Sequence, residues 1–251
     1  MPRPASPVGV AISSLRAVLG NPPLRRLEAA YAAGIAGDAA LLVALIVAAY
    51  AAGGPALVGL LGVARMLPPT VTGLFAARPL ARFRAERLLI AIPLIRAAVA
   101  ALVAAGLMLG LPVWPAFVAA GVASASGALV RPVQSSLFPA LARTSAELLA
   151  ANVVASAGEG VGTLVGPVAA GLAVAVAGPA LGAAVACVLF LVGGVAMVAV
   201  TLPAGGAAMP VGPGRDPVAS GLAIVAAQRG TAVVVGAFLA QVFVRGLLLT
   251  L

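Results

Sequence analysis

The sequence predicts an all-α protein that crosses a membrane several times, and three observations carry this prediction. Of the 251 residues, 63% are hydrophobic and 8% are charged, and the mean hydropathy is +1.20. A soluble domain is roughly 45–50% apolar and about 25% charged, so this chain has too few charges to cover a soluble surface. Its apolar runs are long and continuous, whereas membrane β-strands alternate apolar and polar residues in segments of about ten.

A helix needs about 20 largely apolar residues to cross a bilayer. By this measure the chain contains six complete spans, which we expect at 29–52, 55–77, 88–110, 113–134, 150–174 and 179–202. Turn-forming residues separate them, for example Gly53-Gly54-Pro55 after the first span and Ala177-Gly178-Pro179 before the last. We therefore predict a six-helix membrane unit over 29–202.

The segments outside this unit differ from it in composition. Residues 1–28 carry four arginines and lack the apolar region of a cleavable signal peptide, so we expect an N-terminal cytoplasmic segment. Residues 203–230 are rich in Gly and Pro, which is typical of a flexible linker. Residues 231–251 are apolar again, and we expect them to begin a seventh span.

The distribution of arginine predicts the orientation of the chain. All fifteen basic residues are arginine, and eleven of them lie in the segments that would share the side of the N-terminus, whereas the turns on the other side have none. Positive charge marks the cytoplasmic side, so we expect a cytoplasmic N-terminus. Arginine without lysine, in a chain rich in Ala, Gly and Val, is typical of a GC-rich bacterial genome. We therefore expect a multi-pass protein of the bacterial cytoplasmic membrane, and interpret its pI near 11.7 as topology rather than nucleic-acid binding.

Several catalytic classes are excluded by the residues that are missing. The chain has no histidine, and its one cysteine, Cys187, lies in an apolar run. His/Cys metal sites, Ser–His–Asp hydrolysis and disulfide frameworks therefore cannot form. We expect no enzyme, no metal and no cofactor.

Charged residues inside the spans are the candidate functional groups, because a charge at mid-bilayer costs at least about 2.5–3.5 kcal/mol on insertion scales. Asp38, Arg65, Arg96 and Glu159 fall near the middle of their spans, and Arg131 lies near the end of the fourth. Two interpretations are open. The charges are ion pairs that lock helices together, or the two acids carry protons, since apolar surroundings favour the neutral form of a carboxyl group.

The fifth span contains closely spaced small residues followed by a proline. Gly158, Gly162 and Gly166 would let another helix approach closely, and Pro167 removes a backbone hydrogen bond and permits a kink. This pattern indicates either tight packing alone or a bending helix at a moving interface.

Three motifs in these spans resemble those of the major facilitator superfamily of secondary transporters. The loop after the second span, GLFAARPLARFRAERLL, matches the family's pattern at Gly73, Arg82, Phe83 and Arg87, with Ala81 at the usual acidic position. The fourth span has Arg131-x-x-Gln134, followed by Ser135 instead of Gly. The antiporter motif of the fifth span is matched by four residues: Gly162, Gly166, Pro167 and Gly171. The stretch FPALARTSAELLAAN (138–152) also looks like a loop of bacterial drug and metabolite exporters.

The resemblance implies a fold and a function. Members have twelve spans in two six-helix halves joined by a cytoplasmic loop, so the chain would be the amino-terminal half, with the carboxy-terminal half as a partner. The implied activity is proton-coupled export of small amphipathic molecules by alternating access.

The resemblance also implies roles for individual residues. Asp38 and Glu159 would carry protons, and Arg131 and Gln134 would line the cavity. Arg65 and Arg96 belong to none of the motifs, and we expect them from their depth alone to be buried charge partners. Gly73, Arg82 and Arg87 would form the cytoplasmic gating loop, and the fifth-span motif (Gly162, Gly166, Pro167 and Gly171) the moving interface. The alternative is a non-transporting membrane sensor or scaffold coupled to a cytoplasmic domain, which the alanine at position 81 favours.

Overall fold

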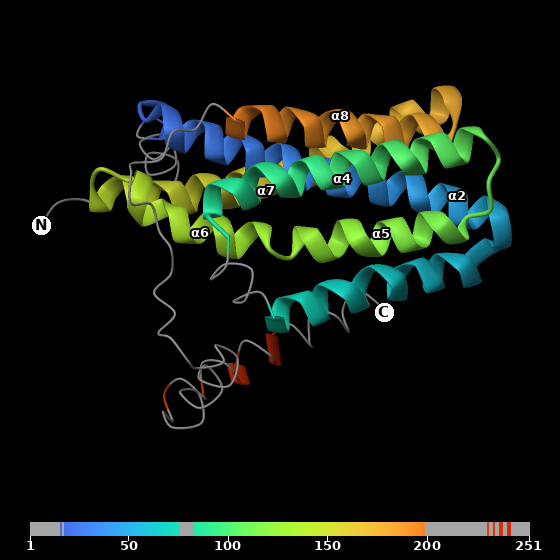
Figure 1. Cartoon of the computed structure of the whole chain (residues 1–251), viewed down its shortest axis with the longest axis horizontal. Coiled ribbons are helices and arrows are strands. Elements are labelled where there is room, and N and C mark those ends of the chain that lie inside the picture. The colour runs from blue at the N-terminus through green and yellow to red at the C-terminus, as the bar shows by residue number, and fades with distance from the viewer. Residues whose placement is uncertain are drawn as a thin grey trace, which may run out of the picture.

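The computed structural model describes residue 16, residues 18–75 and 83–198, and six residues between 230 and 241. These described residues form an all-helical bundle with no strand (Figure 1). Five helices among them are long and apolar enough to cross a membrane. Arg82, Ala81 and nearly all of the expected linker and seventh span (203–251) lie outside the described residues.

The first helix, α2 (Pro22–Phe75), consists of two limbs that run in opposite directions (Figure 1). A straight helix of 54 residues would be about 80 Å long, far more than the ~30 Å hydrocarbon core of a bilayer. The backbone dihedral angles of Gly53 and Gly54 are not helical. Gly54 has φ +65°, a left-handed conformation that glycine adopts without strain. The turn predicted at these residues is confirmed, and the limbs correspond to the first two predicted spans.

The remaining helices run back and forth along the bundle (Figure 1). Their bounds are α4 (Ala85–Met108), α5 (Trp114–Gly127), α6 (Val130–Leu141), α7 (Ser145–Ala177) and α8 (Pro179–Val198). Only Ala128 and Leu129 separate α5 from α6, and both keep right-handed helical angles. The two helices therefore form one rod, which corresponds to the fourth predicted span.

Three helices extend beyond the predicted spans, and at two of these boundaries a polar cap explains the difference. α2 begins at Pro22 rather than 29, since Asn21 accepts a hydrogen bond from the Leu24 amide (3.5 Å) at its N-terminus. α7 begins at Ser145 rather than 150, because Thr144 accepts a hydrogen bond from the Glu147 amide (3.1 Å). α6 also extends beyond the predicted end of the fourth span at 134.

Asn21 and Glu147 join the start of α2 to the α6–α7 junction. The Asn21 Nδ2 atom donates to the Leu141 carbonyl and to the Glu147 carboxylate, both at 3.0 Å. The same carboxylate accepts a hydrogen bond from the backbone amide of Arg143 at 2.8 Å. These contacts hold three helix ends together at one end of the bundle.

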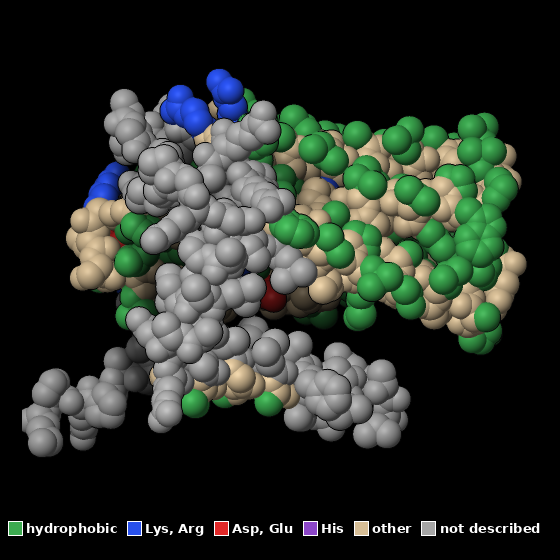
Figure 2. Space-filling model, turned by 60° about the horizontal axis from the view of Figure 1, so that its bottom comes forward, with side chains coloured by type: hydrophobic (Ala, Val, Ile, Leu, Met, Phe, Trp, Pro, Cys, Tyr) green, Lys and Arg blue, Asp and Glu red, His purple; other side chains and the backbone are tan. Residues whose placement is uncertain are grey.

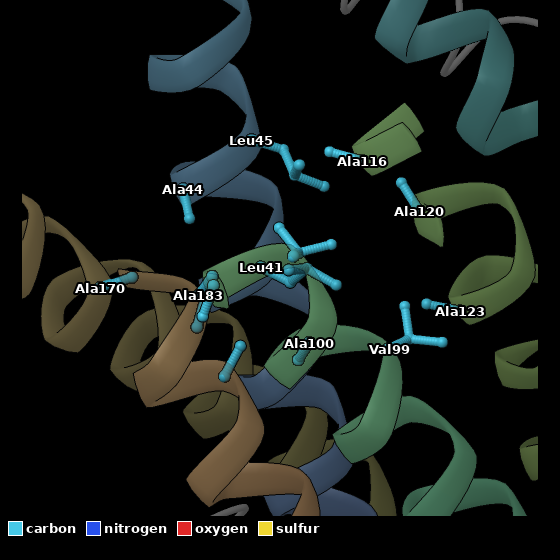
Figure 3. Close-up of a cluster of buried hydrophobic side chains, with 14 of the residues drawn as sticks. Leu41, Ala44, Leu45, Val99, Ala100, Ala116, Ala120, Ala123, Ala170 and Ala183 are labelled. Carbon is cyan, nitrogen blue, oxygen red and sulfur yellow. The ribbon is translucent and has the colours of Figure 1, made fainter. Parts of the chain in front are cut away.

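Small side chains dominate the core and let the helices approach closely. One apolar cluster lies toward the end where the limbs of α2 meet, and many of its members are alanine (Figure 3). On α7, a Cβ at Gly162 or Gly166 would collide with the backbone of α2 at Ala32 or Ala36. The close helix contact predicted for these two glycines is confirmed.

Arginine side chains gather at one end of the bundle, as Figure 2 shows at its left. The start of α2, the start of α4 and the α6–α7 junction lie at this end (Figure 1). The opposite end holds the turns at Gly53-Gly54, 109–113 and Gly178, none of which contains arginine. The uneven distribution of arginine along the sequence is therefore also an uneven distribution between the two ends of the bundle.

Candidate functional site

Two polar centres lie inside the bundle, and the first limb of α2 contributes to both. Glu28, Tyr31 and Asp38 fall within an arc of about 80° on this limb, at 100° per residue, and we call these three residues the polar stripe. Asp38 is about 10 Å further along the helix axis than Tyr31, at 1.5 Å per residue. The stripe thus divides into a deeper centre at Asp38 and one nearer the start of the helix at Glu28 and Tyr31.

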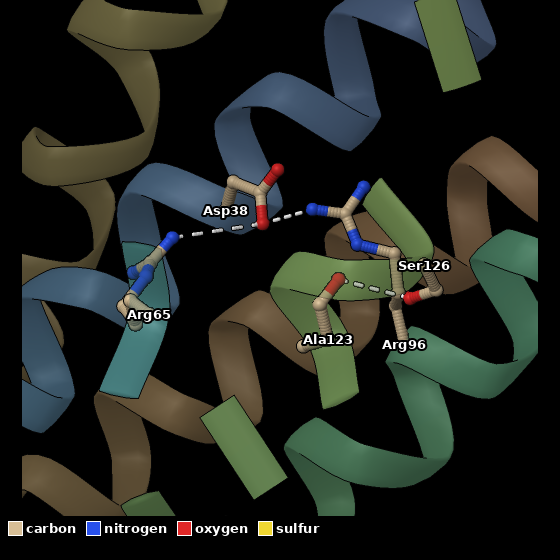
Figure 4. Close-up of polar contacts among 5 residues, drawn as sticks. All are labelled: Asp38, Arg65, Arg96, Ala123 and Ser126. Atoms are coloured by element: carbon tan, nitrogen blue, oxygen red, sulfur yellow. Dashed lines mark hydrogen bonds and ion pairs between the residues drawn. The ribbon is translucent and has the colours of Figure 1, made fainter. Parts of the chain in front are cut away.

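The deeper centre is formed by Asp38, Arg65 and Arg96, which come from the two limbs of α2 and from α4 (Figure 4). Oδ1 of Asp38 forms an ion pair with Nη2 of Arg96. The same oxygen lies 3.9 Å from Nη2 of Arg65. One carboxylate is thus shared by two guanidinium groups, and the centre has a net charge of about +1. Of the four charged residues expected at one depth, Asp38, Arg65 and Arg96 lie together here, whereas Glu159 lies elsewhere.

Arg96 is fixed in place by its surroundings. Its side chain is only 3% exposed, and its Cζ atom lies 4.4 Å from the centroid of the Phe190 ring, a cation–π contact. Gly127 of α5 faces the guanidinium group, and a Cβ there would lie 3.3 Å from Nη2. Arg96 therefore has little room to change its conformation.

The second centre joins α2, α6 and α7. Gln134 donates from Nε2 to the Glu28 carboxylate at 3.3 Å, and the residues are 1% and 5% exposed. The Tyr31 hydroxyl donates to the Glu159 carboxylate at 3.3 Å. The Cζ atom of Arg131 lies 5.3 Å from the centroid of the Tyr31 ring. Arg131 and Gln134 thus lie together at this centre, as expected. Glu159 is exposed and also lies here, rather than at the depth of Asp38 where the sequence analysis expects it.

Glu28 is the site residue that sequence reasoning missed. It was assigned to an N-terminal cytoplasmic segment, yet it is buried and one of its carboxylate oxygens, Oε1, has no hydrogen-bond partner among the described residues. The signal was present in Asn21-Pro22-Pro23, since a capping residue followed by proline marks the first turn of a helix. A helix that begins at Pro22 includes Glu28. Because Glu28 and Tyr31 are three residues apart, they then lie on the same face of this helix.

The expected gating loop and moving interface are placed only in part. Gly73 and Arg87 are exposed, at the end of α2 and near the start of α4, and Arg82 lies outside the described residues. Gly162 and Gly166 contact α2, but a Cβ at Gly171 would meet no atom within 4 Å. α7 continues as a helix through Pro167, so the kinked moving interface stays a prediction.

Comparison with known proteins gives no match to a family model, to a curated protein or to a solved structure. The fold and the two centres are therefore described from their own geometry. The resemblance to the major facilitator superfamily rests on the sequence motifs alone.

Proposed function

We propose that this chain is the amino-terminal half of a secondary transporter of the major facilitator type, which exports small amphipathic molecules in exchange for protons. One observation carries the proposal: two polar centres with titratable groups lie along a single helix of an otherwise apolar bundle. Charged residues within membrane helices are costly, and they commonly belong to proton or substrate pathways.

In this proposal Glu28 is the principal proton carrier. Its carboxylate is buried against Gln134 and feels the positive charge of Arg131, and its Oε1 atom has no partner among the described residues. An ionised Glu28 is attracted to Arg131, whereas a protonated Glu28 can donate a hydrogen bond of its own. Each protonation state therefore favours different contacts between α2 and α6, which couples the proton to conformation.

Asp38 has a different role in this scheme. Asp38 neutralises part of the charge of Arg65 and Arg96. We assign Asp38 the role of counter-charge to the two arginines. Glu159 is exposed and accepts a hydrogen bond from Tyr31, and we assign it a supporting role at the second centre.

The membrane arrangement follows from the arginine end of the bundle. We propose that this end faces the cytoplasm of a bacterial cell. In the family that the motifs resemble, two halves enclose a midplane site and rock about it. The transport experiments proposed here therefore use the full-length protein.

Proton exchange can be measured in proteoliposomes with a trapped pH-sensitive dye. Three aromatic probes of matched size are added outside: anionic toluenesulfonate, neutral toluenesulfonamide and cationic trimethylphenylammonium. An exchanger moves protons out of the lumen as a substrate enters, so at least one probe should make the lumen more alkaline. No pH change with any probe would count against transport and favour the sensor or scaffold.

A further inference from the structure

We propose that the centre of Asp38, Arg65 and Arg96 binds an oxyanion, the sulfonate, carboxylate or phosphate group of an amphipathic substrate. This inference deepens the proposed function, because it names the charge class of the transported molecule. Binding itself does not depend on transport, so the two claims are tested separately below.

The first argument is the balance of charge. Two guanidinium groups face one carboxylate, and no other acid among the residues with described side chains lies within ion-pair distance of either arginine. An uncompensated cation inside an apolar bundle is costly. An anionic ligand would neutralise the excess, whereas a cationic ligand would find one carboxylate that is already shared.

The second argument is the unused hydrogen-bonding capacity. Nη1 of Arg65 and Nε of Arg96 are buried, and neither has a hydrogen-bond partner within the described part of the chain. Guanidinium groups present a rigid fork of donors that matches the geometry of oxyanions. The centre therefore offers donors from two arginines and lacks an acceptor for them.

The third argument is that the side chains of the two arginines differ in conformational freedom. Arg96 is packed against Phe190 and is 3% exposed, so its guanidinium group is held in a fixed position on one side of the centre. Arg65 is 18% exposed and approaches Asp38 only to 3.9 Å, so its guanidinium group can turn toward a ligand. Asp38 is 28% exposed, which means that the centre is open on the side of Asp38 and Arg65.

Ligand binding is measured by the thermal stability of the detergent-solubilised full-length protein, at constant ionic strength. A ligand that binds the folded state raises the melting temperature with its concentration. We expect toluenesulfonate to raise it, and the neutral toluenesulfonamide to have at least about tenfold weaker effect, since a charge-assisted hydrogen bond contributes strongly at a buried site. Equal stabilisation by the two probes would overturn the proposal. An unchanged melting temperature with toluenesulfonate would also overturn the proposal. It would mean that the arginines bind no anion, because an acid elsewhere in the full-length protein already neutralises them.

Variants locate the binding. Arg65→Gln should weaken toluenesulfonate binding at least about tenfold, and Arg65→Lys, which keeps the charge but loses the fork, should weaken it less. Arg143→Gln is the matched control, since Arg143 is exposed at the α6–α7 junction, and it should bind as the wild type does. Wild-type affinity in Arg65→Gln would overturn the assignment to this centre.

The proposal and the proposed function fail in different ways. If toluenesulfonate binds through Arg65 but none of the probes moves protons in proteoliposomes, the anion site stands and the exporter is refuted. If only trimethylphenylammonium moves protons, the exporter stands and the anion site is refuted as the substrate site.

Discussion

At the scale of single residues, the three acids of the two polar centres have distinct environments. Asp38 is held by two arginines, Glu28 by the amide of Gln134, and Glu159 by the hydroxyl of Tyr31 at an exposed position. Removing a charge has a different consequence in each, because only at Asp38 does the change leave two guanidinium groups without their counter-charge.

This difference predicts the stabilities of two conservative variants. Asp38→Asn should lower the free energy of unfolding by about 3–5 kcal/mol, the cost of breaking a buried ion pair in soluble proteins. Glu159→Gln should change it little, because the amide oxygen still accepts from Tyr31 and the site is exposed. Thermal melting of both purified proteins checks this. Equal melting temperatures would show that Asp38 is not the counter-charge of the arginines.

At the scale of elements, close packing between α2 and α7 determines which glycines matter. A Cβ at Gly166 would overlap the backbone of Ala36, whereas a Cβ at Gly160, less than two turns away on the same helix, would meet nothing within 4 Å. Both are glycines in an Ala-rich helix, so their sequence surroundings do not distinguish them.

The same substitution should therefore have opposite effects at these two positions. Gly166→Ala forces α7 away from α2 and should cost about 1–3 kcal/mol, as overpacking does. Gly160→Ala should be neutral or stabilise by up to about 1 kcal/mol, because alanine favours helix more than glycine does. Melting temperatures of the two variants test this, and a loss at Gly160→Ala equal to that at Gly166→Ala would contradict the packing.

The polar junction of three helix ends leads to a further prediction. Asn21→Ala removes the hydrogen bonds to Leu141 and Glu147 and should cost about 1–2 kcal/mol. Asn152→Ala is the control, since Asn152 is exposed and its side-chain amide donates to the Leu148 carbonyl within its own helix. Proteolysis at the α6–α7 junction should increase in Asn21→Ala alone. The same cleavage rate in both variants would count against a tie between α2 and α7.

At the scale of the whole molecule, hydropathy was sufficient to predict the all-helical class and the presence of several helices long and apolar enough to cross a membrane. The reversal at Gly53-Gly54 followed from its turn residues. Equal depth indicated the cluster of Asp38, Arg65 and Arg96, but it wrongly added Glu159, which lies beside Tyr31. Which charged residues pair with each other could not be predicted, because pairing depends on helix neighbours that are distant in sequence. Glu28 lies outside the predicted first span for a local reason: hydropathy places the start of the span at 29, whereas the Asn21-Pro22 cap starts the helix seven residues earlier.

The arginine end of the bundle predicts which faces a labelling reagent can reach. In a Cys187→Ala background, a cysteine placed at Leu111, in the exposed turn between α4 and α5, should react with an impermeant maleimide in intact cells. A cysteine at Arg143 should react only after the cells are opened. Labelling of the Arg143 position from outside would reverse the orientation.

Replacement of Glu28 tests the central claim most directly. Glu28→Gln keeps the shape of the side chain and the acceptor for Gln134 but cannot ionise. In proteoliposomes of the full-length protein, we predict that it abolishes the pH change driven by toluenesulfonate, with unchanged melting temperature and unchanged toluenesulfonate binding. Glu159→Gln, measured in parallel, should retain the pH change. Proton movement by Glu28→Gln at the wild-type rate would contradict the account.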